Sequence, residues 1–267
     1  MSAAERRPEG CDIMTPSLLD HPLITRRYFF PFPCRFPDPC RVEREGAVLG
    51  CRHFRVDPAA LTIVHFHGNG ETVADYLDDF AAAVAALGCN LFLAEYRGYG
   101  MSTGVPELGR MLGDVPAVIA ATGQPPERLV LFGRSVGSLF ALHGVAAVPG
   151  IAGLIVESGI ADPLERLLMR VSPGELGVTP AAFAAAVAAE LDQRRKLSLF
   201  HGRTLVLHAR NDVLVDVSHG ERLYQWACEP KRLHVFSRGD HNNILAVNLD
   251  EYFRIVGEFL AGSRVPM

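Results

Sequence analysis

The feature that most constrains the fold of this chain is the alternation of short apolar runs with segments of helical spacing. Strand-like runs occupy 41–56, 61–66, 90–96, 128–133, 153–158, 204–209 and 232–237. Helical spacing occurs at 71–87, 107–121, 136–148, 218–228 and 247–260. Buried strands that alternate with helices form a mostly parallel sheet with helices on both faces. We therefore predict an α/β protein of this architecture.

Length and charge narrow the class of protein further. A chain of 267 residues buries about three quarters of its unfolded surface, so it needs no metal or disulfide for stability. Its 26 basic and 30 acidic residues give a net charge of −4, which provides no general attraction to nucleic acid or to anionic membranes. No apolar run approaches the roughly 18 residues of a membrane helix. We expect a soluble protein without nucleic-acid partners or integral membrane association.

The cysteine pattern points to a reducing compartment. The six cysteines show no CxxC spacing, and residues 1–20 lack the apolar core of a secretory signal. Several cysteines lie in or next to apolar runs, as Cys89 does before the run 90–96. We predict reduced thiols rather than three disulfides, and therefore a cytoplasmic protein.

The sequence predicts a single folded domain, preceded by a mobile N-terminal segment and containing one insert. Residues 1–27 are expected to be a mobile N-terminal segment, and 28–267 the folded domain. Residues 159–203 are too long for one crossover helix. They form either a two-helix connection or a short helical lid over a site. Within them, Thr179 followed by Pro180 is a helix start.

The pattern Gly-x-Ser-x-Gly occurs twice, and its context separates the two matches. Ser135 follows the strand-like run 128–133 and directly opens the helical segment 136–148. A strand, a tight turn and a helix form a nucleophile elbow, which exposes a serine hydroxyl. Ser102 runs instead into Val105 and Pro106, so we interpret it as a turn residue.

A serine nucleophile needs a base and an orienting acid, and both follow in the chain. Asp212 and His241 each come just after a strand-like run. The carboxyl ends of parallel strands share one edge of a sheet, so Ser135, Asp212 and His241 should meet there. Asp216 and Glu157 are the rival acids, and Asp216 is also placed to cap the helix at 218–228.

Two backbone N–H groups are candidates for an oxyanion hole. Asn69 lies in the turn His67-Gly68-Asn69-Gly70 at the end of an earlier strand, and Val136 follows the nucleophile. Both N–H groups should lie near the Ser135 hydroxyl. We expect His67 to hold its loop by hydrogen bonding rather than to act as a base.

With these motifs the chain resembles the α/β-hydrolase superfamily, and in it the Bem46-like serine hydrolases, which include α/β-hydrolase domain-containing proteins 12, 13 and 17. The resemblance rests on residues 67–70, 95–102, 133–137 and 157–158, and on Asp212 with His241-Asn242. It implies an α/β-hydrolase fold with a Ser135 nucleophile, an Asp212 acid, a His241 base and oxyanion donors at Asn69 and Val136. It also implies hydrolysis of esters or related acyl bonds.

The predicted activity is hydrolysis of a small carboxylic ester or thioester through an acyl-enzyme. A peptidase of the same fold and a non-catalytic binding relative remain alternatives. The sequence has no metal-ligand spacing, P-loop or dinucleotide fingerprint, so we expect no cofactor and no metal. The apolar residues of the insert are predicted to line the acyl pocket: Leu164, Leu167, Leu168 and Met169.

Overall fold

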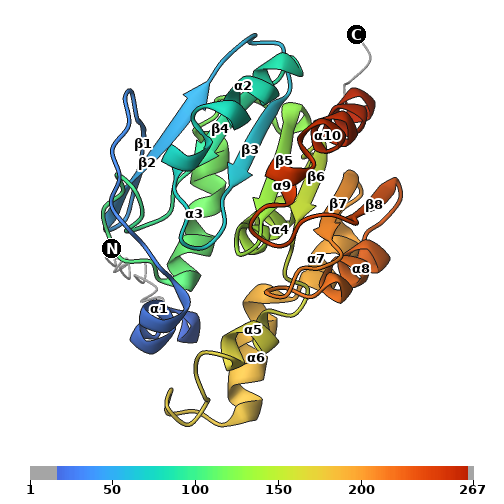
Figure 1. Ribbon diagram of the computed structural model, residues 1–267. Coiled ribbons are helices and arrows are strands. Elements are labelled where there is room, and N and C mark those ends of the chain that lie inside the picture. The colour runs from blue at the N-terminus through green and yellow to red at the C-terminus, as the bar shows by residue number, and fades with distance from the viewer. Residues whose placement is uncertain (1–16, 264–267) are drawn as a thin grey trace, which may run out of the picture.

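The computed structural model describes residues 17–263, which form an eight-stranded sheet in the order β1-β2-β4-β3-β5-β6-β7-β8 (Figure 1). β2 is antiparallel to both of its neighbours, and the pairings from β4 to β8 are parallel. The predicted α/β-hydrolase fold with a mostly parallel sheet is confirmed. The strands are β1 (Cys40–Arg44), β2 (Ala47–Phe54), β3 (Thr62–Phe66), β4 (Asn90–Ala94), β5 (Leu129–Arg134), β6 (Gly153–Glu157), β7 (Arg203–Ala209) and β8 (Lys231–Phe236).

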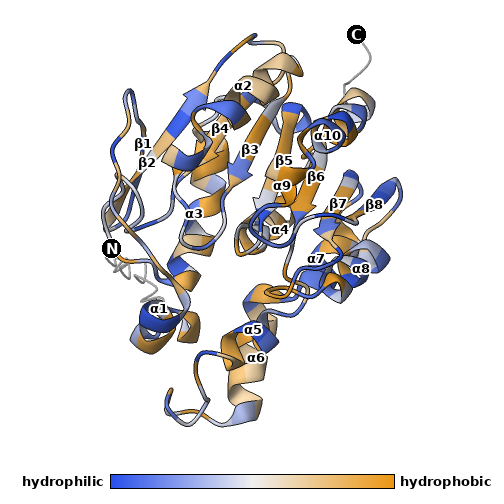
Figure 2. Cartoon of the chain, in the orientation of Figure 1, coloured by the Kyte–Doolittle hydropathy of each residue, from blue (hydrophilic) through white to orange (hydrophobic). Residues whose placement is uncertain are grey.

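Two layers of helices cover the two faces of this sheet. The helices of the described range are α1 (Pro22–Tyr28), α2 (Asp79–Ala86), α3 (Leu108–Ala120), α4 (Gly137–Ala147), α5 (Pro163–Leu168), α6 (Pro180–Leu191), α7 (Gln193–Leu199), α8 (Val217–Trp226), α9 (Ile244–Val247) and α10 (Leu249–Ser263). Successive strand residues face opposite layers, so Ile63 packs with α2 and α10, whereas Val64 packs with α3 and α4. Both faces are therefore buried: every residue of β3 and β4 is buried, and the central strands are mostly apolar (Figure 2).

The N-terminal segment begins its ordered structure earlier than predicted. Residues 17–27 belong to a short 3₁₀ turn and to α1, and Leu19 and Ile24 are fully buried in the core. α1 has a good start, because His21 Nδ1 accepts the Leu23 N–H at 3.1 Å and Pro22 occupies the first helical position. The boundary at residue 28 was thus too late. Residues 1–16 of the predicted mobile segment lie outside the described residues.

The insert at 159–203 contains three helices, α5, α6 and α7, rather than two. Thr179 caps α6 as predicted, since its hydroxyl accepts the Ala182 N–H at 3.2 Å. α5 and α6 lie beyond the sheet edge at which β6 ends (Figure 1). Leu167 and Phe183 are buried in the main core, so the insert packs as part of the same unit. Its movement as a lid stays a prediction.

Two further expectations concern membrane helices and thiols. Between residues 17 and 263, no helix has both the length and the apolar character that crossing a membrane requires. The thiols of four cysteines are free: Cys34, Cys40, Cys51 and Cys228. Cys11 lies outside the described residues.

Candidate active site

Ser135 lies in a tight turn between β5 and α4. Its φ is 52°, in the left-handed region that residues other than glycine rarely adopt. The two flanking residues must be glycines, because a side chain at either position would collide with neighbouring backbone. A Cβ on Gly133 would lie 2.5 Å from the Gly137 carbonyl oxygen, and one on Gly137 would lie 2.0 Å from that of Phe66. The backbone therefore has the geometry of a nucleophile elbow, with the serine at the start of a helix.

Ser135, His241 and Asp212 form a continuous hydrogen-bonded chain. His241 Nε2 lies 2.9 Å from Ser135 Oγ, and His241 Nδ1 lies 2.7 Å from Asp212 Oδ2. Asp212 Oδ1 accepts the N–H groups of Leu214 at 3.0 Å and Val215 at 2.8 Å. The structure thus brings together the three residues that the sequence analysis predicted. Chemically, the arrangement can accept a proton from a hydroxyl and hold the imidazole in one orientation.

The pKa of Asp212 lies below its usual value. Burial alone would raise it, but hydrogen bonds from His208 and His241 stabilise the carboxylate more strongly. His208 Nε2 lies 3.5 Å from Asp212 Oδ2 and 2.8 Å from the Val215 carbonyl oxygen. Asp212 is therefore ionised at neutral pH, the state that stabilises an imidazolium. The sequence analysis missed His208, although its place near the end of the run 204–209 was a usable signal.

The rival acids have other partners. Asp216 accepts the Ser218 N–H at 3.0 Å and caps α8, as predicted. Glu157 lies 3.0 Å from Arg134 Nε and accepts a short hydrogen bond from the Tyr252 hydroxyl. In the described part of the chain, neither carboxylate is hydrogen-bonded to His241.

Arg134 connects the serine turn to the histidine loop. Its Nη2 donates to the His241 carbonyl oxygen at 2.7 Å, and its other nitrogens pair with Glu71 and Glu157. The guanidinium is almost fully buried, so these partners offset its desolvation. It is a positioning residue that sequence reasoning missed, because the position between Gly133 and Ser135 carries no residue preference in the motif.

The loop at 67–70 presents its backbone to the Ser135 turn. Asn69 and Val136 both line the cavity that contains Ser135. Within residues 17–263, no acceptor is hydrogen-bonded to the N–H group of either residue. The Asn69 side chain is fixed, since its Oδ1 accepts the Tyr99 hydroxyl at 2.8 Å and the Phe30 N–H at 3.0 Å.

His67 stabilises this loop by hydrogen bonding, as predicted. Its Nε2 lies 2.6 Å from Glu95 Oε1, and its Nδ1 lies 2.8 Å from the Gly68 carbonyl oxygen. Burial opposes its protonation, but the charge and hydrogen bond of Glu95 outweigh burial and raise the pKa of His67. The pair is fully buried and does not reach Ser135, so it stabilises the loop rather than the reacting group.

A cavity of about 180 Å³ opens over Ser135. We name it the Ser135 cavity. Its apolar lining includes Phe30, Ile160, Leu214 and Val215, and its basic lining includes Arg166 and Arg170. Among the described residues, no three His, Cys, Asp or Glu side chains are grouped so that they could hold a metal ion.

The structure does not place the predicted pocket residues of α5 in this cavity. Leu167 is buried in the core and Leu164 packs against it. Leu168 and Met169 are 46% and 65% exposed. The reason is the orientation of α5: Arg166 is the helix residue that lines the cavity, together with Arg170 from the turn after the helix.

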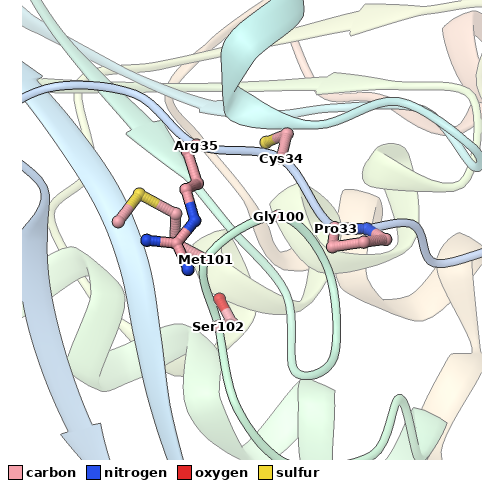
Figure 3. A pocket seen from close by; sticks show the side chains of 6 residues that line it. All are labelled: Pro33, Cys34, Arg35, Gly100, Met101 and Ser102. Carbon is pink, nitrogen blue, oxygen red and sulfur yellow. The ribbon is translucent and has the colours of Figure 1, made fainter.

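The second Gly-x-Ser-x-Gly match lies in a separate pocket of about 520 Å³ (Figure 3). Its lining residues are Pro33, Cys34, Arg35, Gly100, Met101 and Ser102. The Ser102 hydroxyl accepts the Gly50 N–H at 2.9 Å, and the described residues that line this pocket include neither histidine nor carboxylate. Ser102 is therefore a turn residue, as predicted.

The strand order and the helix layers define the class of α/β-hydrolases. An esterase from Pyrococcus furiosus has the same fold, with a TM-score of 0.65 and 18% identity over 84% of this chain and 89% of that one. A structural match at this level of identity establishes a shared fold but not a shared activity.

Sequence comparison finds one family model and several curated proteins that are similar to this chain. The family described as serine aminopeptidase S33 matches residues 57–179. The uncharacterized protein YfhR of Escherichia coli K12 is 28% identical over 191 residues, 69% of this chain and 64% of that protein. Human α/β hydrolase domain-containing protein 17C is 28% identical over 182 residues, 66% of this chain and 52% of that protein. The chain therefore has the α/β-hydrolase fold and is similar in sequence to α/β hydrolase domain-containing protein 17C and to YfhR. It spans between half and two thirds of the length of these relatives.

Proposed function

We propose that this protein is a serine hydrolase that cleaves small carboxylic esters or thioesters through an acyl-enzyme. The observation that carries the proposal is the chain of two hydrogen bonds, 2.9 and 2.7 Å long, from Ser135 through His241 to Asp212. Ser135 lines the Ser135 cavity, where a substrate carbonyl can reach its hydroxyl. No cofactor is needed for this chemistry.

In the first half of the reaction, His241 Nε2 takes the Ser135 proton while Oγ attacks the acyl carbonyl carbon. Asp212 holds Nδ1–H and stabilises the imidazolium. The carbonyl electron pair moves to oxygen, where the N–H groups of Asn69 and Val136 would bind it, each worth roughly 3 kcal/mol of barrier. The tetrahedral intermediate then expels the alcohol or thiol, which takes its proton from His241.

In the second half, water attacks the acyl-enzyme while His241 accepts its proton. The same oxyanion donors stabilise the second tetrahedral intermediate. Its collapse releases the carboxylic acid and returns the proton to Ser135 Oγ. Arg134, through its bond to the His241 carbonyl oxygen, keeps the imidazole in place during both halves.

The test is turnover of p-nitrophenyl acetate together with labelling by a fluorophosphonate. The wild-type protein should turn over the ester and be labelled at Ser135. Ser135→Ala should remove both signals, whereas Ser102→Ala should keep both. Absence of turnover and of labelling in the folded wild type would favour a non-catalytic binding protein.

An aminopeptidase is the second candidate, because the matching family carries that description. Such an enzyme needs a carboxylate for the substrate ammonium group. Glu71 lines the cavity, but it is paired with Arg134 and accepts the Tyr76 hydroxyl and the Gly68 N–H. We therefore favour the esterase, and alanine p-nitroanilide assayed beside p-nitrophenyl acetate would separate the two.

We also propose a cytoplasmic location. Cys40 and Cys51 are paired directly across β1 and β2, yet both remain thiols, a state typical of reducing compartments. Fractionation of cells expressing the untagged protein checks this assignment.

A further inference from the structure

The Ser135 cavity carries more positive charge than its proposed chemistry requires. Its lining contains three arginines and one glutamate. Arg134 is neutralised by its ion pairs with Glu71 and Glu157. Arg166 and Arg170 form no ion pair with any carboxylate in the described residues. This local excess stands out because the whole chain has a net charge of −4.

Arg166 of α5 and Arg170 of the turn that follows the helix both line the Ser135 cavity. Arg170 lies two residues past the end of α5, in a turn where its N–H donates to the Leu167 carbonyl oxygen at 2.9 Å. Their nearest interactions are with uncharged groups. Arg166 Nη1 lies 3.1 Å from Met169 Sδ, and the Arg170 guanidinium lies 5.8 Å from the centre of the Phe30 ring.

The carboxylates near α5 are paired with other basic side chains, not with Arg166 or Arg170. Asp162 and Glu165 each lie 3.8 Å from Arg222, on α8. Glu165 also lies 3.6 Å from His219, and Glu175 lies 3.0 Å from Arg27. Between residues 17 and 263, no acidic side chain is therefore paired with the two guanidinium groups that line the cavity.

Two guanidinium groups without acidic partners, at the wall of a partly enclosed cavity, form a site for an anion. Guanidinium binds carboxylate and phosphate oxygens through directed, charge-assisted hydrogen bonds. The field is stronger in a hollow with low-dielectric walls than on an open surface. The oxyanion formed in catalysis does not need these arginines, because backbone N–H groups are available for it.

We propose that the substrate of this site is an ester or thioester that carries an anionic group, a carboxylate or a phosphate, held by Arg166 and Arg170. This inference rests on the proposed serine hydrolase function. The small volume of the cavity places the anionic group close to the scissile bond. Binding the anion fixes the acyl carbonyl over Ser135 and thereby lowers KM.

The experiment compares kcat/KM for matched anionic and neutral esters. One pair is p-nitrophenyl hemisuccinate and p-nitrophenyl valerate, which differ by a carboxylate on the acyl side. A second is 4-acetoxybenzoate and its methyl ester, and a third is 4-acetoxyphenyl phosphate and phenyl acetate. At least one anionic ester should exceed its neutral partner by about tenfold or more at low salt. The preferred pair identifies the anion and the side of the scissile bond.

Variants then assign that preference to the arginines. Arg166→Gln and Arg170→Gln should each lower the anionic-to-neutral ratio by about tenfold, mainly through KM, and Arg166→Lys should restore part of it. Arg254→Gln is the matched control, because Arg254 pairs with Glu258 on α10 and does not line the Ser135 cavity, and its ratio should equal that of the wild type. Both arginines reach solvent, so the variants should fold, which circular dichroism verifies.

Failure of this inference is distinct from failure of the proposed function. If Ser135-dependent turnover of neutral esters occurs but no anionic ester is preferred, the anion site is refuted and the hydrolase stands. A preference that survives in both glutamine variants also refutes it. If no ester of either kind is hydrolysed, the proposed function fails and the inference fails with it.

Discussion

At the scale of single residues, the identity of the orienting acid is the assignment most open to a direct test. Asp212→Asn keeps an oxygen for the N–H groups of Leu214 and Val215, so the fold should be retained. Its NH₂ group, however, would face His241 Nδ1 and favour the wrong tautomer. We expect kcat to fall by roughly 10⁴ with little change in the unfolding midpoint, measured by ester turnover and thermal denaturation.

The rival acids supply the controls for this prediction. Asp216→Asn retains an N-cap residue and should keep normal kcat. Glu157→Gln removes one charge from the Arg134 network and should lower stability more than kcat. Near-normal turnover in Asp212→Asn, with a large loss in either rival, would move the acid to that rival.

The same scale shows where sequence reasoning succeeds and where it ends. Ser135, Asp212 and His241 were predictable because strand ends and chain order bring them to one edge of the sheet. His208 near the end of β7 and Arg134 at the end of β5 also lie at this edge, but the sequence does not show that their side chains reach Asp212 and the His241 carbonyl oxygen. Arg166 and Arg170 lay within the segment identified as a pocket wall, but its leucines were the more visible signal.

At the scale of elements, α5 and its neighbours set the size of the cavity and hence the acyl preference. A volume of about 180 Å³ is below the 300–1,000 Å³ typical of drug-sized ligands. We expect kcat/KM for p-nitrophenyl esters to be highest between acetate and butyrate and to fall toward palmitate. A series of neutral esters read at 405 nm measures this profile.

A pair of leucines tests which elements form the wall. Leu214 lines the cavity and is half exposed, so Leu214→Ala should shift the profile toward longer chains at little cost in stability. Leu168→Ala is the matched control and should leave the profile unchanged, since its side chain faces away. A wild-type optimum at palmitate would contradict a rigid wall and support opening of the insert as a lid.

Helix phase explains why the wall itself was not predictable. The Leu-rich composition of 163–169 correctly indicated a helix that packs on the core. Which side of that helix faces the cavity depends on the path of the chain between the end of β6 and the start of α5. Ser158, whose φ is 47°, turns the chain at the beginning of that path. A strained backbone of that kind leaves no periodic signal in the sequence.

At the scale of the whole molecule, the sheet was predictable because burial on both faces requires continuous apolar strands. The same burial places histidines where protonation is unfavourable. Burial lowers the pKa of His53 to about 4 and that of His143 to about 4, and holds that of His65 well below its usual value. His67 shows the opposite shift, because Glu95 favours its charged form.

These shifts predict that stability falls as the pH drops from about 7 toward 5.5. Near an unfolded pKa of about 6.5, His53, His65 and His143 take up protons in the unfolded chain but not in the folded protein, and linkage then favours unfolding. The contribution of His67 has the opposite sign, since its stabilisation is present below pH 6.5 and is lost as the pH rises through its raised pKa. Burial also lowers the pKa of His219 and of His234, so five groups against one should give a net loss, measured by urea denaturation across this range.

A double variant makes the prediction specific to these histidines. His53→Gln with His143→Gln removes two of the five groups that resist protonation, and both side chains are half-buried, so the substitutions should be tolerated. The free energy of unfolding of this variant should depend less on pH between 7 and 5.5 than that of the wild type. Most carboxylates titrate below this window, so they contribute little to the difference. Equal pH dependence in the two proteins would show that other groups control acid stability.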